Sequence, residues 1–185
     1  MRKQKGFSLI ELLIVVAIIL IIAAIAIPNL LRARIAANES SAVSSLRTIN
    51  TAEVTYQSAY PTVGYSADLV SLGPGAGVYV CPAGGPVSTA ACLIDGVVSN
   101  NGNPAGSGKS GYTLGAAGYA GATGTLLVVY TVGAAPLTYN QTGVRAFCAS
   151  EDGVIHFSPN TGGAITVPET GQGACVDPAY LVLNQ

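Results

Sequence analysis

An apolar run that begins at Phe7 and ends just before Pro28 limits the fold of this chain more than any other segment. As a helix that rises ~1.5 Å per residue, the stretch from Phe7 to Ile27 would span roughly 30 Å, the thickness of the hydrocarbon core of a bilayer. Three basic residues precede it: Arg2, Lys3 and Lys5. Their charges would hold the start of the chain in the cytoplasm. The sequence therefore predicts a membrane helix, with everything after Pro28 outside the cytoplasm.

Glu11 is the only charged residue between Phe7 and Leu31. A carboxylate at membrane depth costs on the order of 2.5–3.5 kcal/mol on insertion scales. A cleaved secretory signal, with Ala24-Ile25-Ala26 as its cleavage site, would have a shorter apolar stretch and no use for this acid. An ordinary anchor helix with an incidental glutamate is the other alternative. We expect instead that Glu11 has a partner.

The composition of the chain points to a single domain with little surface charge. Of its 185 residues, 9% are charged and 50% are hydrophobic, and the part beyond residue 60 is mildly acidic. Such a surface suits a protein that packs against copies of itself, or a low-charge secreted protein, and composition does not choose between them. The acidic distal part offers no electrostatic footprint for nucleic acid.

Four cysteines lie in the distal part: Cys81, Cys92, Cys148 and Cys175. An even number beyond a membrane segment indicates two disulfides formed in an oxidising compartment. A metal site is disfavoured because there is no C-x-x-C pair and His156 is the only histidine. Four cysteines allow three pairings, which the sequence leaves open.

The stretch from Lys5 to Leu12, KGFSLIEL, resembles the prepilin cleavage and methylation motif of type IV pilins and pseudopilins. The resemblance rests on the basic leader, Gly6, Phe7, Glu11 and Pro28. It implies that a prepilin peptidase cuts between Gly6 and Phe7 and that the new amine of Phe7 is methylated. It also implies that Glu11 meets this amine on a neighbouring subunit during assembly, because an unpaired charge in an apolar bundle is costly.

The expected fold class is α+β: a long N-terminal helical spine packed on an antiparallel sheet. After a leader of residues 1–6 come a transmembrane or filament-core helix over 7–28 and an amphipathic half over 29–60. Pro28 predicts a kink within a continuing helix, or else the end of the membrane span. The apolar stripe of the second half consists of Ile35, Ala42, Leu46, Ile49, Tyr56 and Tyr60. The opposite, polar face is expected to carry Arg34, Asn38, Ser41, Ser45 and Thr48.

Residues 61–185 are expected to form the globular head. It would comprise a Gly-rich region over 61–111, an antiparallel sheet over 112–167 and a disulfide-bounded segment over 168–185. Cys81–Cys92 would close the Gly-rich region, and the resemblance to pilins implies that Cys148–Cys175 closes the last segment. The expected strands are Val78–Val80, Tyr112–Leu114, Leu126–Val132, Val144–Cys148, Val154–Phe157 and Ala164–Val167.

Three sequence patterns resemble functional sites, but each lacks residues that such a site requires. The run from Gly106 to Ser110 lacks the first glycine of a phosphate-binding loop, since Asn103 stands at that position, and no helix is expected to follow. His156 has no G-x-S-x-G nucleophile, so we interpret it as a solvent-facing histidine on a strand. Glu151-Asp152-Gly153 is typical of a turn rather than a calcium site, which needs more oxygens.

The predicted function is that of a structural, non-enzymatic subunit of a type IV pilus, without cofactor or metal. Its partners would be neighbouring copies, the prepilin peptidase and methyltransferase, the inner-membrane assembly platform, minor pilins and, before assembly, the inner membrane. The mature protein would lie in an extracellular filament. The alternatives are a pseudopilin of a type II secretion system and a pilin-anchored adhesive subunit. Whether the filament serves adhesion, motility, DNA uptake or electron transfer is left open.

Overall fold

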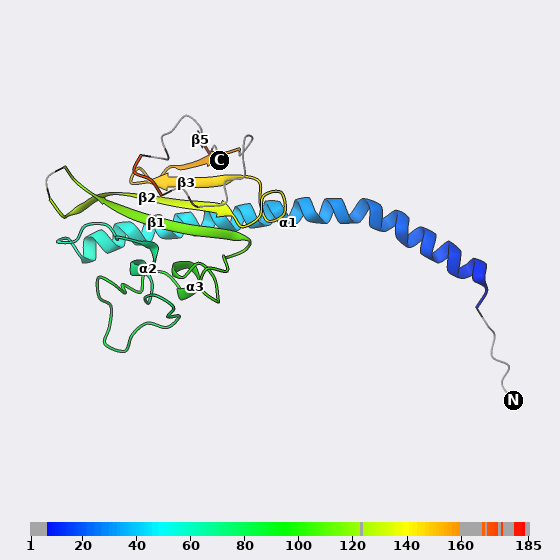
Figure 1. The fold of residues 1–185 in the computed structure, drawn as a ribbon, viewed down its shortest axis with the longest axis horizontal. Helices are drawn as coiled ribbons and strands as arrows, with labels where there is room; N and C mark the ends of the chain where they lie inside the picture. The colour runs from blue at the N-terminus through cyan, green and yellow to red at the C-terminus, as the bar shows by residue number, and fades with distance from the viewer. Residues whose placement is uncertain are drawn as a thin grey trace. The chain divides into compact units, whose positions relative to one another are not determined.

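The computed structural model describes residues 7–122, 124–159, 168, 170–173, 175 and 180–183. The predicted leader with Gly6 and the predicted strand Ala164–Val167 lie outside the described residues. The chain forms two compact units, Met1–Arg34 and Ile35–Gln185. The element order is one long helix, two short helices and five strands (Figure 1).

Helix α1 runs from Leu9 to Ala59 and contains Pro28. No glycine occurs within it, and the helix continues past the proline, as predicted. Proline removes one backbone donor and crowds the preceding turn, but the surrounding residues are helix formers or apolar residues that tolerate this. In the first unit every large apolar side chain of α1 is exposed.

The second unit is built on an antiparallel meander in the strand order β1-β2-β3-β4-β5. The strands are β1 (Tyr112–Ala120), β2 (Leu127–Pro136), β3 (Ala146–Ser150), β4 (Ile155–Ser158) and β5 (Leu181–Val182). The connections between the first four strands are too short for crossover helices, so successive strands pair directly. This confirms the predicted α+β class, a long apolar helix followed by an antiparallel sheet.

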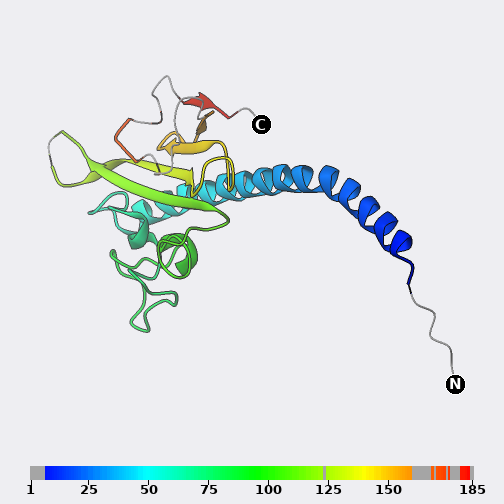
Figure 2. The ribbon, with the colours of Figure 1, turned by 45° about the vertical axis from the view of Figure 1, so that its right-hand side comes forward.

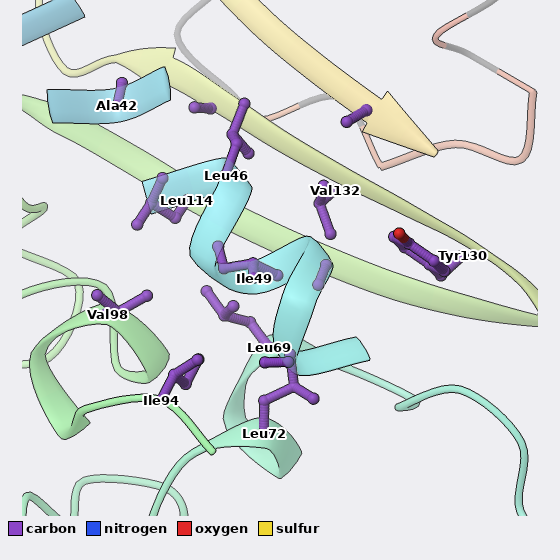
Figure 3. Packing of buried hydrophobic residues seen from close by; sticks show 14 of the residues in the cluster. Ala42, Leu46, Ile49, Leu69, Leu72, Ile94, Val98, Leu114, Tyr130 and Val132 are labelled. Carbon is purple, nitrogen blue, oxygen red and sulfur yellow. The ribbon is translucent and has the colours of Figure 1, made fainter. Parts of the chain in front are cut away.

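The core of the second unit lies around the apolar stripe of α1. Figure 3 shows Leu46 and Ile49 of α1 with Val132 of β2 on one side and Leu72 and Ile94 on another. The latter two belong to the region of the short helices α2 (Leu69–Leu72) and α3 (Gly96–Ser99). In Figures 1 and 2 this region and strand β3 lie on opposite sides of the distal part of α1.

The predicted strand Val78–Val80 is wrong, because the backbone of Val78 bonds to a turn and to a side chain rather than to a neighbouring strand: its N–H donates to the Gly75 carbonyl at 3.2 Å. The Asn100 Nδ2 group donates to the Val78 carbonyl at 2.8 Å, and Asn100 Oδ1 accepts from the Gly77 N–H at 2.6 Å. Gly96 allows this close approach, since a Cβ there would lie 2.5 Å from the Tyr79 Cα. The helices α2 and α3 were not predicted, although Asp68 and Asp95 cap their first turns.

Several strand bounds also differ from the prediction. β1 continues to Ala120 through a Gly- and Ala-rich sequence of low strand propensity, because every residue of it pairs with β2. β2 likewise extends to Pro136, and β5 was not predicted. Cross-strand pairing, which no local pattern reveals, decides these bounds.

The predicted polar face of α1 is partly wrong. Ser45 is buried, and it accepts a hydrogen bond from Lys109 Nζ at 3.0 Å. Asn38 Nδ2 donates to the Thr142 carbonyl, and Ser41 bonds to Ser110. Loops of the head reach around the helix and supply polar partners there, so these side chains face protein rather than water.

His156 is buried, which contradicts its interpretation as a solvent-facing residue. It pairs directly with Cys148, so both side chains lie on the sheet face opposite α1. Cys148 is bonded to Cys175, so this disulfide also lies on that face. Among the described residues, His156 Nδ1 has no hydrogen-bond partner.

Candidate assembly site

The first turn of α1 places Glu11 at the edge of the apolar surface. The Ser8 carbonyl accepts the first helical hydrogen bond, from the Leu12 N–H, so Ser8 is the N-cap residue. The Ser8 N–H donates to Glu11 Oε2 at 3.0 Å. This is one half of a capping box, in which the third helical residue returns to bond the N-cap N–H. In the single subunit, Glu11 thus stabilises the start of its own helix.

The surface around Glu11 is apolar and exposed. Phe7 is 81% exposed and Leu9 80%, and the large apolar side chains from Ile10 to Leu31 are exposed too. This helix is long and apolar enough to cross a membrane. Burial of so many side chains, each worth about 1.5–3 kcal/mol, would contribute tens of kcal/mol. The first unit therefore requires an apolar environment, supplied by lipid or by other helices.

Within the second unit, Glu39 joins α1 to the loop before β3. Its side chain is 7% exposed and forms an ion pair with Arg145 at 2.7 Å between Oε2 and Nη2. Glu39 Oε1 also accepts from the backbone N–H groups of Val144 and Arg145 at 3.0 and 3.1 Å. The Arg145 guanidinium lies over the rings of Phe147 and Phe157. These contacts hold the sheet in register on the helix.

A second buried acid, Glu53, lies further along the same face of α1. It is fully buried, and it accepts hydrogen bonds from Ser66 N–H at 2.9 Å and from Ser66 Oγ at 2.6 Å. Desolvation by burial raises the pKa of Glu53 to about 7, against the lowering effect of the two Ser66 hydrogen bonds. Sequence reasoning missed both acids, although they stand in the two gaps of the predicted stripe, between Ile35 and Ala42 and between Ile49 and Tyr56.

The patterns that the sequence analysis rejected are structural elements. Lys109 of the glycine-rich run bonds Ser45, and strand β1, not a helix, follows it. Glu151 and Asp152 form a turn in which Asp152 Oδ1 accepts from the Val154 N–H at 2.9 Å. No cluster suited to a metal ion occurs among the residues that the structure describes. The two disulfides, Cys81–Cys92 and Cys148–Cys175, confirm the expected pairing.

The N-terminal segment has clear relatives. Residues 1–27 match the family described as the prokaryotic N-terminal methylation motif. Forty residues are 68% identical to the type IV wide pilus major component PilA4 of Thermus thermophilus, covering 22% of this chain and 30% of that protein. The type IV major pilin protein PilA of Myxococcus xanthus is 46% identical over 54 residues, 29% of this chain and 24% of that protein.

The N-terminal segment thus carries the methylation motif and is similar to the corresponding part of two type IV pilins. The pilin-type segment is also found in the type II secretion system core protein G of Vibrio cholerae, which is 35% identical over 77 residues, 40% of this chain and 53% of that protein. The chain thus spans less than a third of the length of the two pilins and about half of the secretion protein. No solved structure matches the chain at a significant level. The long apolar helix followed by a five-stranded antiparallel sheet agrees with the α+β fold of type IV pilins.

Proposed function

We propose that this chain is a structural, non-enzymatic subunit of a type IV pilus that polymerises through the apolar half of α1. The observation that carries the proposal is an exposed apolar helix with a single carboxylate, Glu11, in its first turn. The similarity of this segment to two type IV major pilins supports it. Such a helix is stable in the inner membrane before assembly and in a bundle of like helices afterwards, with the heads outside.

The proposed processing follows from the pilin-type segment. A prepilin peptidase removes Met1 to Gly6, and the amine of Phe7 is methylated. The charged amine of an incoming subunit then meets Glu11 of a neighbour. Because the surroundings are apolar, an arrangement that leaves either charge unpaired has a high free-energy cost. The pair thus fixes the register of one helix on the next. The peptidase, the assembly platform and minor pilins are the further partners that this route requires.

The intact mass of the mature protein tests the processing. Pilin processing predicts loss of Met1 to Gly6 and gain of one methyl group, and a signal peptidase would instead cut after Ala26. Mechanical shearing of cells then separates two functions. A major pilin is the dominant sheared polymer, whereas a secretion pseudopilin, the second candidate because of the Vibrio cholerae similarity, stays with the cell envelope.

A pair of substitutions separates the two roles of Glu11. Glu11→Gln keeps an oxygen that accepts from the Ser8 N–H but has no charge, whereas Glu11→Ala loses both. If the charge pairs with the Phe7 amine, both variants insert in the membrane and neither yields sheared filaments. Normal filaments from Glu11→Gln together with none from Glu11→Ala would show that capping alone matters, and would refute the charge pairing.

A further inference from the structure

The described residues near the C-terminus contact the sheet face opposite α1 at two places. At the first, a Cβ on Gly115 of β1 would lie 2.9 Å from Thr170 Cγ2, and the Tyr119 hydroxyl donates to the Thr170 carbonyl. At the second, Cys175 is bonded to Cys148 of β3. The chain is thus attached to this face on both sides of β2, which pairs with β1 and with β3.

A hollow of about 250 Å³ lies on the same face of the sheet. Residues of β2, of β3 and the turn after it, and of the C-terminal segment line it: Val129, Thr131, Ser150, Glu151, Gln172 and Cys175. Pockets for drug-sized ligands measure about 300–1,000 Å³, so this hollow suits a smaller ligand, about the size of a single sugar ring.

Thr131 brings a buried hydroxyl group to the hollow. It stands between Tyr130 and Val132, whose side chains belong to the core (Figure 3), so its own side chain points to the opposite face. Thr131 is 0% exposed, and its Oγ1 has no hydrogen-bond partner in the part of the chain that the structure describes. A buried hydroxyl group without a partner is unfavourable. Because a hydroxyl group both donates and accepts, a ligand that carries hydroxyl groups would satisfy it fully.

Carboxylates make the hollow negatively charged. Glu151 lines it, and Asp152 beside it accepts from Ser150 Oγ at 3.2 Å. The only lysine and arginine that follow α1, Lys109 and Arg145, both bond to side chains of α1 and so lie on the other side of the sheet. Glu151 has no ion pair among the described residues. An ammonium group, which has three donors and no acceptor, suits such a carboxylate.

We propose that this hollow binds a hexosamine, a six-carbon sugar with a free amine, as a unit of a glycan. The ammonium group of the sugar pairs with Glu151, and a hydroxyl group of the same ring exchanges hydrogen bonds with Thr131. A C–H face of the ring packs on Val129, and Ser150 and Gln172 are available to the other hydroxyl groups. A simple amine would leave Thr131 without a full partner, and a neutral sugar would leave the charge of Glu151 unpaired.

This site goes beyond the proposed function and does not depend on it, since one subunit supplies all of its residues. It is also compatible with a filament of bundled helices. In such a filament the sheet face opposite α1 is turned away from the helices, so a ligand reaches the hollow from outside. Each subunit would present one site, and many weak sites on one filament would act together on a glycan with several amino sugars.

Three small probes test the chemistry of the ligand on the full-length chain in detergent micelles, with ligand-detected nuclear magnetic resonance as the readout. Glucosamine carries both the ammonium and the hydroxyl groups. N-acetylglucosamine has a similar ring but no charge, and we expect it to bind on the order of tenfold more weakly. Cyclohexylamine has the charge on a ring without hydroxyl groups, and it should bind roughly fivefold more weakly than glucosamine. Equal binding of glucosamine and N-acetylglucosamine would overturn the proposal.

Variants locate the binding in the hollow. Glu151→Gln should weaken glucosamine binding on the order of tenfold and remove the preference over N-acetylglucosamine. Thr131→Val keeps the shape of the side chain without its hydroxyl group and should weaken binding roughly fivefold. Asp95→Asn is the matched control, because it removes one carboxylate charge at α3 but still caps that helix, and it should leave binding unchanged. Near-ultraviolet circular dichroism checks that each variant is folded.

The remaining outcomes are also decisive. If Asp95→Asn weakens binding as much as Glu151→Gln does, glucosamine is attracted by the net charge alone and the site is refuted. If calcium chloride shows binding that depends on Glu151 and glucosamine shows none, the hollow is a metal site and the proposal is wrong. All of these measurements use the single subunit, so their failure leaves the proposed pilus function standing. The sheared-filament experiment in turn tests that function without testing the hollow.

Discussion

Glu53 makes the stability of the head depend on pH, and Glu53→Gln removes that dependence. Ser66 Oγ lies 2.6 Å from Glu53 Oε1 and 3.0 Å from the Asp68 carbonyl oxygen, but a hydroxyl group has only one hydrogen to donate. When Glu53 is ionised, the two oxygens compete for it. When Glu53 is protonated, it donates to Ser66 Oγ, and the Ser66 hydroxyl is free to donate to Asp68. Glutamine reproduces the second arrangement at every pH, since its amide donates as the protonated acid does.

The size of the effect follows from the pKa of Glu53, which burial raises from 4.5 to about 7. Because the folded protein holds this proton more tightly than the unfolded chain, the stabilisation is complete below about pH 4.5 and is lost as the pH rises through 7. Each pH unit in that window changes the free energy of unfolding by about 1.4 kcal/mol. The head should therefore lose about 3 kcal/mol between pH 4.5 and pH 7.5 from this group.

Chemical denaturation of the full-length chain in detergent micelles, with both disulfides oxidised, measures this free energy. The chain has nine tyrosines and no tryptophan, so tyrosine circular dichroism reports on the head. The difference in unfolding free energy between Glu53→Gln and the wild type should be small at pH 4.5. It should grow to about 2–3 kcal/mol in favour of the variant at pH 7.5. Taking the difference removes the contribution of the other titrating groups.

Two results would refute this reasoning. In the first, the wild type and Glu53→Gln change in parallel over the whole pH range, so that Glu53 is not the group responsible. In the second, the variant is less stable at pH 7.5, which would show that the ionised carboxylate is favoured by Ser66. Ser66→Ala is the control, since it leaves Glu53 Oε1 without its partner and should destabilise by about 1–3 kcal/mol.

Other perturbations of the head have effects of predictable size. Glu39→Ala removes the buried partner of Arg145 and should lower the free energy of unfolding, measured with urea, by about 3–5 kcal/mol. Glu39→Gln can still accept from the backbone N–H groups and should lower it by less. Replacing Cys81 and Cys92 together by serine should lower the unfolding free energy by about 2–3 kcal/mol, and an unchanged urea midpoint would contradict this. Asp95→Ala removes the cap of α3 and should cost about 0.5–2 kcal/mol, with faster amide exchange in the capped turn.

The features that were read correctly from the residues depend on neighbours close in sequence. The helix from Leu9 to Ala59 follows from an apolar run and a 3.6-residue stripe, and its passage through Pro28 follows from helix formers on both sides. The meander follows from short strand patterns separated by turn residues. Glu11 is conspicuous because nothing else between Phe7 and Leu31 is charged. Local spacing and hydropathy are sufficient for each of these.

The features that were missed depend on partners far away in the chain. β1 is nine residues long because β2 pairs with all of it, and the glycine-rich sequence of β1 does not by itself predict a strand of this length. Val78–Val80 has strand residues but pairs with no strand, and its Val78 carbonyl accepts from the side chain of Asn100 instead. The strand pattern around His156 places it on the sheet face opposite α1, yet the folded protein buries it there beside Cys148.

The amino-acid sequence alone thus determined that the chain has an exposed apolar helix with one acid near its start. The hydrophobicity of each side chain and the helical periodicity can both be read from residues that are close in sequence. Which polar groups are buried was settled only when the chain closed on itself. Glu39 and Glu53 interrupt an apolar stripe, and they are tolerated there because Arg145 and Ser66, supplied from more distant segments, satisfy them. A buried charge or hydrogen-bonding group is stable only with its partner in place, and that partner exists only in the folded protein.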